Sequence, residues 1–126
     1  MSSKAKSITS WILCGTVALA LAASAIDKIA LSQHSIQMGT SFGLSPATYR
    51  VLGLIELLST VLFVLPRTAM PGLLLLSSYL GGAIATHLQH NQDILFPVIL
   101  ESIIWIGACL RLPEMTERLF GKKANR

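Results

Sequence analysis

Four long stretches of this chain consist almost entirely of apolar residues, and they limit what it can fold into. They run over 8–26, 49–65, 69–88 and 94–112. The charged residues within them are Arg50, Glu56, Glu101 and Arg111. Stretches of about 17–25 apolar residues match the ~30 Å hydrocarbon core of a bilayer when they are helical. Charged residues make up 13% of the chain, about half the share found in soluble domains. The sequence therefore predicts a polytopic membrane protein.

We expect an all-α fold, an antiparallel bundle of four transmembrane helices that forms one transmembrane domain. The expected spans cover about 8–28, 46–65, 69–88 and 94–112, and a basic tail follows over 113–126. Only Pro66, Arg67 and Thr68 separate spans two and three, so these spans must be antiparallel neighbours. Ser45 before Pro46 matches an N-cap followed by proline at the first helical position, so span two should begin at Pro46. The long connection over 27–48 fits either the membrane interface or a cap on the bundle.

Basic residues are distributed unevenly between the two sides of this predicted bundle. If the four spans alternate in direction, Lys28 and Arg50 lie on one side. The opposite side holds Lys4, Lys6, Arg67, Arg111, Arg118, Lys122, Lys123 and Arg126. Because positive charge collects on the cytoplasmic side, both termini are expected to be cytoplasmic. We expect a multi-pass protein of the cell membrane, in a bacterial inner membrane, with the lipid bilayer and not nucleic acid as its partner.

Span one also has features of a secretory signal peptide. Lys4 and Lys6 precede its apolar run, and Ala23-Ser24-Ala25 matches an A-x-A cleavage site. Cleavage would leave three spans and place the new N-terminus outside. The apolar run is long for a signal-peptide core, which favours a retained helix, but the sequence alone leaves both alternatives open.

Span three carries small residues at four-residue spacing, Ser78 with Gly82 and Gly81 with Ala85. Such residues let helix backbones approach closely in lipid, where burial of apolar surface no longer drives association. We therefore expect span three to be the tightly packed centre of the bundle.

Glu56 and Glu101 are acidic residues inside apolar spans. Each lies seven residues from the outer end of its stretch, which places it roughly 10 Å deep in a helical span. A carboxylate at mid-span costs about 2.5–3.5 kcal/mol to insert, so neither side chain is expected to face lipid. Spans two and four run in the same direction, so both acids should point into the bundle at matching depth. If they share a site, repulsion and desolvation would keep at least one of them protonated near neutral pH.

Polar and aromatic residues are predicted to gather around these two acids in the outer half of the bundle. His87 and Tyr79 lie about two turns apart on span three. Trp105 shares a helical stripe with Glu101. Three further charged residues mark the outer ends of spans one and two. The predicted ligand-binding or proton-relay residues are Glu56, Glu101, His87, Lys28, Asp27, Arg50, Tyr79 and Trp105.

The same residues also fit a purely structural role. Glu56 would then pair with Lys28 or Arg50. The partners open to Glu101 are Tyr79, Thr86 and His87. In that case the polar groups would only fix how the helices pack.

The sequence predicts no metal site and no redox pair of thiols. His87 and His90 lie three residues apart, but none of the spacings HExxH, ExxH or CxxC is present. Cys14 and Cys109 fall in the cytoplasmic halves of their spans, where free thiols are expected.

Several segments together resemble the DoxX-like family of small four-helix integral membrane proteins. They are SAIDK at 24–28, GLIE at 53–56, LPRT at 65–68, YLGGAIATH at 79–87, Trp105, and LRLP at 110–113. The resemblance covers roughly residues 8 to 113, and its most specific part is 79–87. It implies the four-helix membrane fold. By motif, the polar positions of the family would fall on Lys28, Glu56 and His87.

What the resemblance implies about function is broad. Its relatives include a membrane subunit linked to thiosulfate–quinone oxidoreduction and proteins tied to methylamine use or thiol redox balance. A quinone is therefore the one cofactor that the resemblance suggests, and no other is identified. A dithiol role is not favoured, because this chain has no paired thiols.

Three functions follow from the sequence. The first is a membrane protein whose outer-half polar cavity binds a small polar or quinone-like ligand. The second is a membrane subunit of a redox enzyme that uses the acids for proton transfer. The third is a structural assembly partner. Because the bundle is small, a homo-oligomer or a redox partner subunit is also expected, and the sequence leaves open whether any reaction is catalysed.

Overall fold

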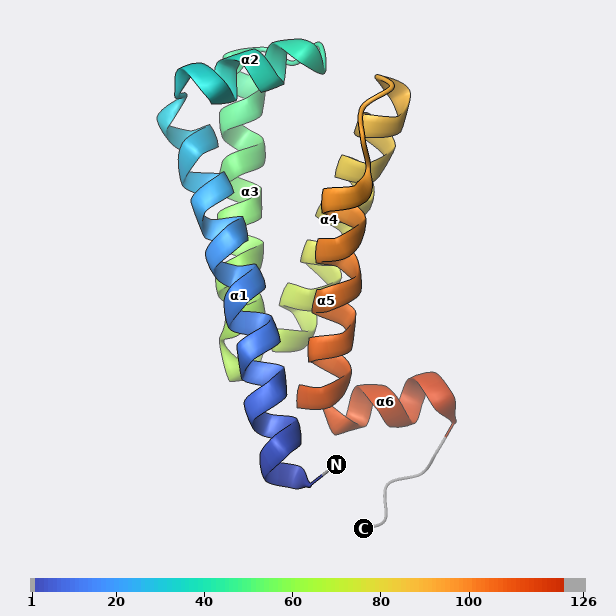
Figure 1. Ribbon diagram of the computed structural model, residues 1–126. Coiled ribbons are helices and arrows are strands. Elements are labelled where there is room, and N and C mark those ends of the chain that lie inside the picture. The colour runs from blue at the N-terminus through green and yellow to red at the C-terminus, as the bar shows by residue number, and fades with distance from the viewer. Residues whose placement is uncertain (1, 122–126) are drawn as a thin grey trace.

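The computed structural model describes residues 2–121, and this part of the chain is helical, without strands. Its elements are α1 (Ser3–Ala30), α2 (Gln33–Ser41), α3 (Pro46–Val64), the 3-10 turn η1 (Pro66–Thr68), α4 (Ala69–Gln89), α5 (Leu95–Arg111) and α6 (Pro113–Phe120). The prediction of an all-α bundle of four apolar helices is confirmed (Figure 1).

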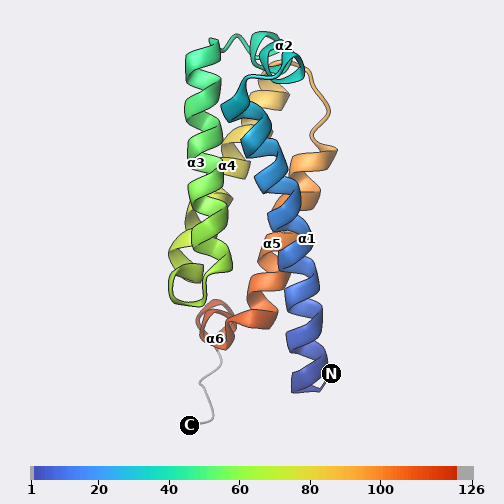
Figure 2. The same ribbon diagram turned by 90° about the vertical axis from the view of Figure 1, so that its left-hand side faces the viewer.

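The four long helices form a ring in which each packs against two others. Helix α1 contacts α3 and α5, and α4 contacts the same two helices. The short helix α2 crosses one end of the bundle, and α6 lies across the other end (Figures 1 and 2). The long connection between spans one and two therefore covers the bundle, which the sequence alone left open.

Local sequence explains where the helices begin and end. The Ser45 side chain accepts a hydrogen bond from the Thr48 amide, and Pro46 is the first residue of α3, as predicted. Ser32 caps α2 by accepting from the Ser35 amide. Between α1 and α2, Leu31 adopts a left-handed conformation at φ 53° and ends α1. The chain thus turns sharply out of α1 and into the helix that covers the bundle.

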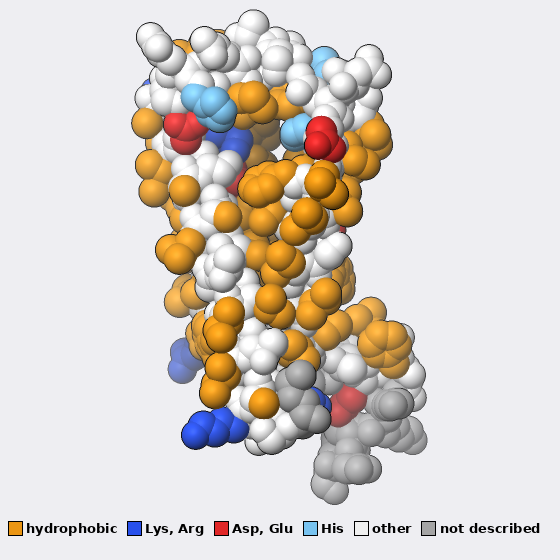
Figure 3. Space-filling model, in the orientation of Figure 1, with side chains coloured by type: hydrophobic (Ala, Val, Ile, Leu, Met, Phe, Trp, Pro, Cys, Tyr) orange, Lys and Arg blue, Asp and Glu red, His pale blue; other side chains and the backbone are white. Residues whose placement is uncertain are grey.

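Three helical segments are long and apolar enough to cross a membrane: α1, α3, and η1 with α4. A fourth candidate joins α5 with α6, which bends away from it by 105°. Large apolar side chains are exposed along the outside of the bundle, as a membrane-embedded surface requires (Figure 3). The start of α1, the turn η1 and the end of α5 share the end of the bundle that carries α6 (Figure 1).

The segment after α5 differs from the basic tail that the sequence predicts over 113–126. Residues Pro113–Phe120 form α6, with Met115 buried. Glu114 in its first turn and Arg118 in its last turn match the helix dipole. The predicted basic residues Lys122, Lys123 and Arg126 lie outside the described residues.

The prediction that span three is the tightly packed centre is wrong. A Cβ added at Gly81 or Gly82 of α4 would meet no atom within 4 Å. Close approach on α4 is found instead at Gly72 near the turn from α3, where an added Cβ would clash with the Phe63 amide nitrogen. Another close approach lies at Gly53 of α3, where an added Cβ would lie 2.7 Å from the Lys28 Cβ and 2.9 Å from the Ala25 carbonyl oxygen. The reason is that part of the small-residue face of α4 borders a cavity instead of another backbone.

Candidate functional site

A cavity of about 460 Å³ lies in the half of the bundle nearest α2. All four long helices contribute to its wall, and it is covered by Met38 of α2 and by Phe42, which follows α2 directly. Most of the lining is apolar, including Leu21, Leu52 and Leu100. Its polar lining residues are Ser24, Lys28, Tyr49, Glu56, Ser78, Tyr79, Thr86 and His87.

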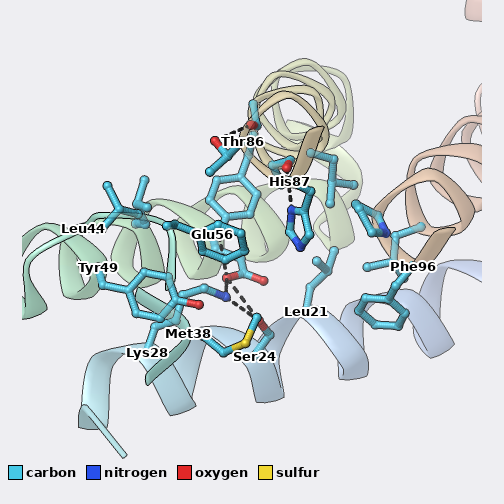
Figure 4. Close-up of a pocket in the computed structure, with 18 of the residues that line it drawn as sticks. Leu21, Ser24, Lys28, Met38, Leu44, Tyr49, Glu56, Thr86, His87 and Phe96 are labelled. Carbon is cyan, nitrogen blue, oxygen red and sulfur yellow. Dashed lines mark hydrogen bonds and ion pairs between the residues drawn. The ribbon is translucent and has the colours of Figure 1, made fainter. Parts of the chain in front are cut away.

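The carboxylate of Glu56 is the centre of a polar cluster in this cavity (Figure 4). Its side chain is 2% exposed. The Lys28 ammonium lies 2.8 Å from Oε2 of Glu56, and the Tyr79 hydroxyl donates to the same oxygen over 3.0 Å. The Ser24 hydroxyl approaches that oxygen at 3.5 Å. The cost of burying the acid is therefore offset by a cation and neutral donors.

Helical spacing and one glycine bring this cluster together. Ser24 and Lys28 lie one turn apart on α1, and Lys28 Nζ also donates to the Ser24 hydroxyl over 2.5 Å. Gly53 lies about one turn before Glu56 on α3 and leaves room for the Lys28 stem. The ring of Tyr49 lies 5.5 Å from Lys28 Nζ, within the range of a cation–π contact.

His87 lines the same cavity from α4. Its Nδ1 lies 2.6 Å from the carbonyl oxygen of Ala83. A carbonyl only accepts hydrogen bonds, so Nδ1 must carry a hydrogen. Phe42 packs on the imidazole with ring centroids 4.8 Å apart. The remaining ring nitrogen, Nε2, is turned toward the space beside Glu56 (Figure 4).

Glu101 belongs to a separate cluster on the seam between α4 and α5. Its Oε1 accepts from the Ser77 hydroxyl over 2.5 Å and from the Trp105 indole over 3.0 Å. Its Oε2 is buried and has no hydrogen-bond partner among the described residues. Glu101 is not among the described residues that line the cavity. The hypothesis that Glu56 and Glu101 share a site is therefore wrong, and the expectation that this sharing keeps one of them protonated loses its basis.

The separation of the two acids has a simple geometric cause. Equal sequence depth fixes the height of a residue along its helix but leaves its direction around the helix axis open. Glu56 faces α1 and α4, because its partners Lys28 and Tyr79 come from those helices. Glu101 faces α4, because Ser77 donates to it from that helix.

Asp27 and Arg50 lie outside the lining of the cavity. Asp27 accepts from the Ser32 hydroxyl over 2.5 Å and lies 3.3 Å from the His34 imidazole, so it joins the end of α1 to α2. Arg50 donates through Nε to the carbonyl oxygen of Ile29 over 3.0 Å. Of the two cations predicted to pair with Glu56, the structure brings Lys28 to it.

The sequence predictions did not include every residue that lines the cavity. Met38 and Phe42 come from the long connection, whose path the sequence leaves open. Ser24 shares a helical face with Lys28, and this spacing would have identified it. Within residues 2–121, no three His, Cys, Asp or Glu side chains are grouped to hold a metal ion, and Cys14 and Cys109 are free.

Comparison with known proteins gives one match. A model of the DoxX-like family matches residues 12–107. No curated protein and no solved structure matches the chain significantly. The matched range includes α3 and α4 in full, most of α1 and α5, and every residue of the Glu56 cluster. The chain therefore belongs to the DoxX-like family.

Proposed function

We propose that this DoxX-like membrane protein binds a small polar or quinone-like ligand in the cavity beside Glu56. The observation that carries the proposal is a largely apolar cavity with a buried ion pair in its wall. Ligand sites commonly combine an apolar lining with a few placed polar groups. Ionisable residues within a membrane are costly, which makes a functional role the first expectation for them.

Access to the cavity also supports binding. Its wall includes Ala20 and Ser24 of α1 and Phe96 of α5, whose side chain is 64% exposed. The space-filling view shows a hollow between α1 and α5 near the α2 end, with a basic side chain visible inside it (Figure 3). A ligand with an apolar body would reach this opening from the surrounding lipid. The quinone-like alternative rests on the family resemblance alone.

The test compares two neighbouring glycines of α4. Gly82 lines the cavity and Gly81 does not, while an added Cβ meets no atom within 4 Å at either position. The purified protein in detergent would be exposed to octan-1-ol or to decylubiquinone, and native mass spectrometry would count bound molecules. We expect Gly82→Phe to abolish binding of any probe that the wild type holds and Gly81→Phe to retain it. Equal binding by both variants and the wild type would overturn the proposal.

A redox-enzyme subunit and an assembly partner remain the alternative functions. The assembly alternative is favoured by the hydrogen bonds that Lys28 and Tyr79 give to Glu56, because such contacts can serve helix packing alone. If assembly is the role, native mass spectrometry finds no probe on the wild type and finds a homo-oligomer or a partner subunit. A redox subunit is expected to bind the quinone in preference to the alcohol.

A further inference from the structure

We infer that the cavity selects a neutral amphiphile whose polar head donates a hydrogen bond, such as an alcohol or a phenol. This inference rests on the proposed function and names its ligand class. It follows from the charge balance of the cavity wall, from the acceptors that face the cavity, and from its apolar lining.

The charge balance excludes ionic ligands. Among the described residues that line the cavity, Lys28 is the one Lys or Arg and Glu56 the one Asp or Glu, and they lie 2.8 Å apart. They balance each other, so the wall offers no surplus charge to an ionic head group. An anion or a cation would lose its hydration on entering and find no uncompensated counter-charge.

Acceptors and donors without a described partner both face the cavity. The described donors to the carboxylate of Glu56 all reach Oε2, from Ser24, Lys28 and Tyr79. The other carboxylate oxygen, Oε1, is turned toward the open part of the cavity (Figure 4). The tautomer of His87 that places its hydrogen on Nδ1, facing Ala83, makes Nε2 a second acceptor. The Tyr49 hydroxyl lines the cavity without a described hydrogen bond and can donate. A hydroxyl head both donates and accepts, so it satisfies both kinds of group, whereas an ether or a carbonyl head only accepts.

The remaining wall selects the body of the ligand. Leu21, Leu52 and Leu100 contribute aliphatic surface, and Phe42, at the end of α2, packs on the His87 ring. An apolar chain of moderate length fits this lining and also partitions into lipid, from which the cavity is reached.

Four probes of matched chain length test this inference: octan-1-ol, 1-methoxyheptane, octanoate and octylammonium. Native mass spectrometry of the purified protein would give their relative occupancies. We expect octan-1-ol to bind about threefold to tenfold more tightly than 1-methoxyheptane, as one net hydrogen bond requires. Both ionic probes are expected to bind more weakly than the alcohol. A wild-type protein that prefers the ether or either ion overturns the inference.

Charge-changing variants sharpen the test. Glu56→Gln leaves the Lys28 charge unbalanced, so octanoate is expected to overtake octan-1-ol by about tenfold or more. Glu101→Gln removes a carboxylate outside the cavity lining, and the wild-type ranking should persist. An unchanged ranking in a folded Glu56→Gln protein contradicts the inference. If that variant does not fold, His87→Leu is the substitute test. It removes the acceptor Nε2, so the ratio of octan-1-ol affinity to 1-methoxyheptane affinity should fall.

The two proposals fail in distinguishable ways. If Gly82→Phe blocks the probes but an ionic probe ranks first in the wild type, the binding function stands and the ligand class is wrong. If Gly82→Phe changes the occupancy of no probe, the cavity is not the binding site and both proposals fail.

Discussion

Two glutamates at matching predicted depth have very different surroundings. Glu56 has a cation within 2.8 Å and receives a hydrogen bond from Tyr79. Glu101 accepts from the neutral donors Ser77 and Trp105 through one oxygen, and its other oxygen is buried without a described partner. Replacing the carboxylate by an amide therefore removes an ion pair at Glu56. At Glu101 the same change only weakens hydrogen bonds.

At the residue scale, we expect Glu56→Gln to be far more destabilising than Glu101→Gln. The first variant leaves the Lys28 ammonium, whose side chain is 12% exposed, without its counter-charge. Breaking a buried ion pair on one side costs about 3–5 kcal/mol. In Glu101→Gln the amide oxygen still accepts from Ser77 and Trp105, so the loss should stay within about 1 kcal/mol. Thermal unfolding in detergent, followed by circular dichroism, measures both.

The double variant Lys28→Met with Glu56→Gln is the control for this prediction. It removes both charges, so it should be more stable than Glu56→Gln alone. Equal losses from the two single glutamine variants would show that the ion pair adds nothing beyond a hydrogen bond.

At the scale of elements, glycines mark where helices touch. Gly53 holds α3 against α1, Gly72 lies against the backbone at Phe63, and Gly107 lies against Cys14. The first contact joins α3 to α1, the second joins α4 to α3 beside the turn between them, and the third joins α5 to α1. The glycines of the small-residue face of α4, by contrast, meet no described neighbour. Close packing thus falls at isolated glycines and not at the repeated small-residue pattern.

Alanine substitutions at Gly53 and Gly81 should therefore have opposite effects. At Gly53 the added methyl would lie 2.9 Å from a backbone oxygen, which forces the helices apart and costs about 1–3 kcal/mol. At Gly81 the methyl meets nothing within 4 Å, and alanine is the better helix former by about 0.5–1 kcal/mol. Melting temperatures of the two variants in the same detergent check the signs. A stabilising Gly53→Ala would mean that α1 and α3 are not held this closely.

At the scale of the whole molecule, the distribution of charge predicts the orientation. Lys4, Lys6, Arg67, Arg111 and Arg118 belong to the end of the bundle that carries α6. Lys28 and Arg50 belong to the end covered by α2. We predict that the α6 end is cytoplasmic, because basic residues favour that side. The cavity would then lie in the outer half of the bilayer.

Single cysteines in a background without Cys14 and Cys109 test this orientation. With a membrane-impermeant maleimide, Gln92→Cys, in the connection from α4 to α5, should be labelled in intact cells. Arg67→Cys, in the turn before α4, should be labelled only after lysis. Labelling of Arg67→Cys in intact cells would reverse the orientation and place the cavity in the inner half.

Much of the fold could be predicted from the sequence because lipid imposes simple local rules. In hydrocarbon, backbone groups must be satisfied within the helix, so apolar stretches become spanning helices wherever they occur. The turn at 66–68 makes spans two and three neighbours, and Ser45 with Pro46 sets the start of α3. The pairing of Glu56 with Lys28 was one of two pairings that the sequence allowed.

The apolar stretches are enough to predict the membrane-spanning helices, their order and the candidate acids. Three features could be seen only once the helices were packed together: Glu56 and Glu101 belong to different clusters, α2 covers a cavity, and α4 borders this cavity with its small residues. Each of these depends on how a helix is rotated about its axis and on which side chains of other helices it meets. The rotation of each helix depends on its packing against all the others in the bundle. The spacing of residues along one helix does not contain that information.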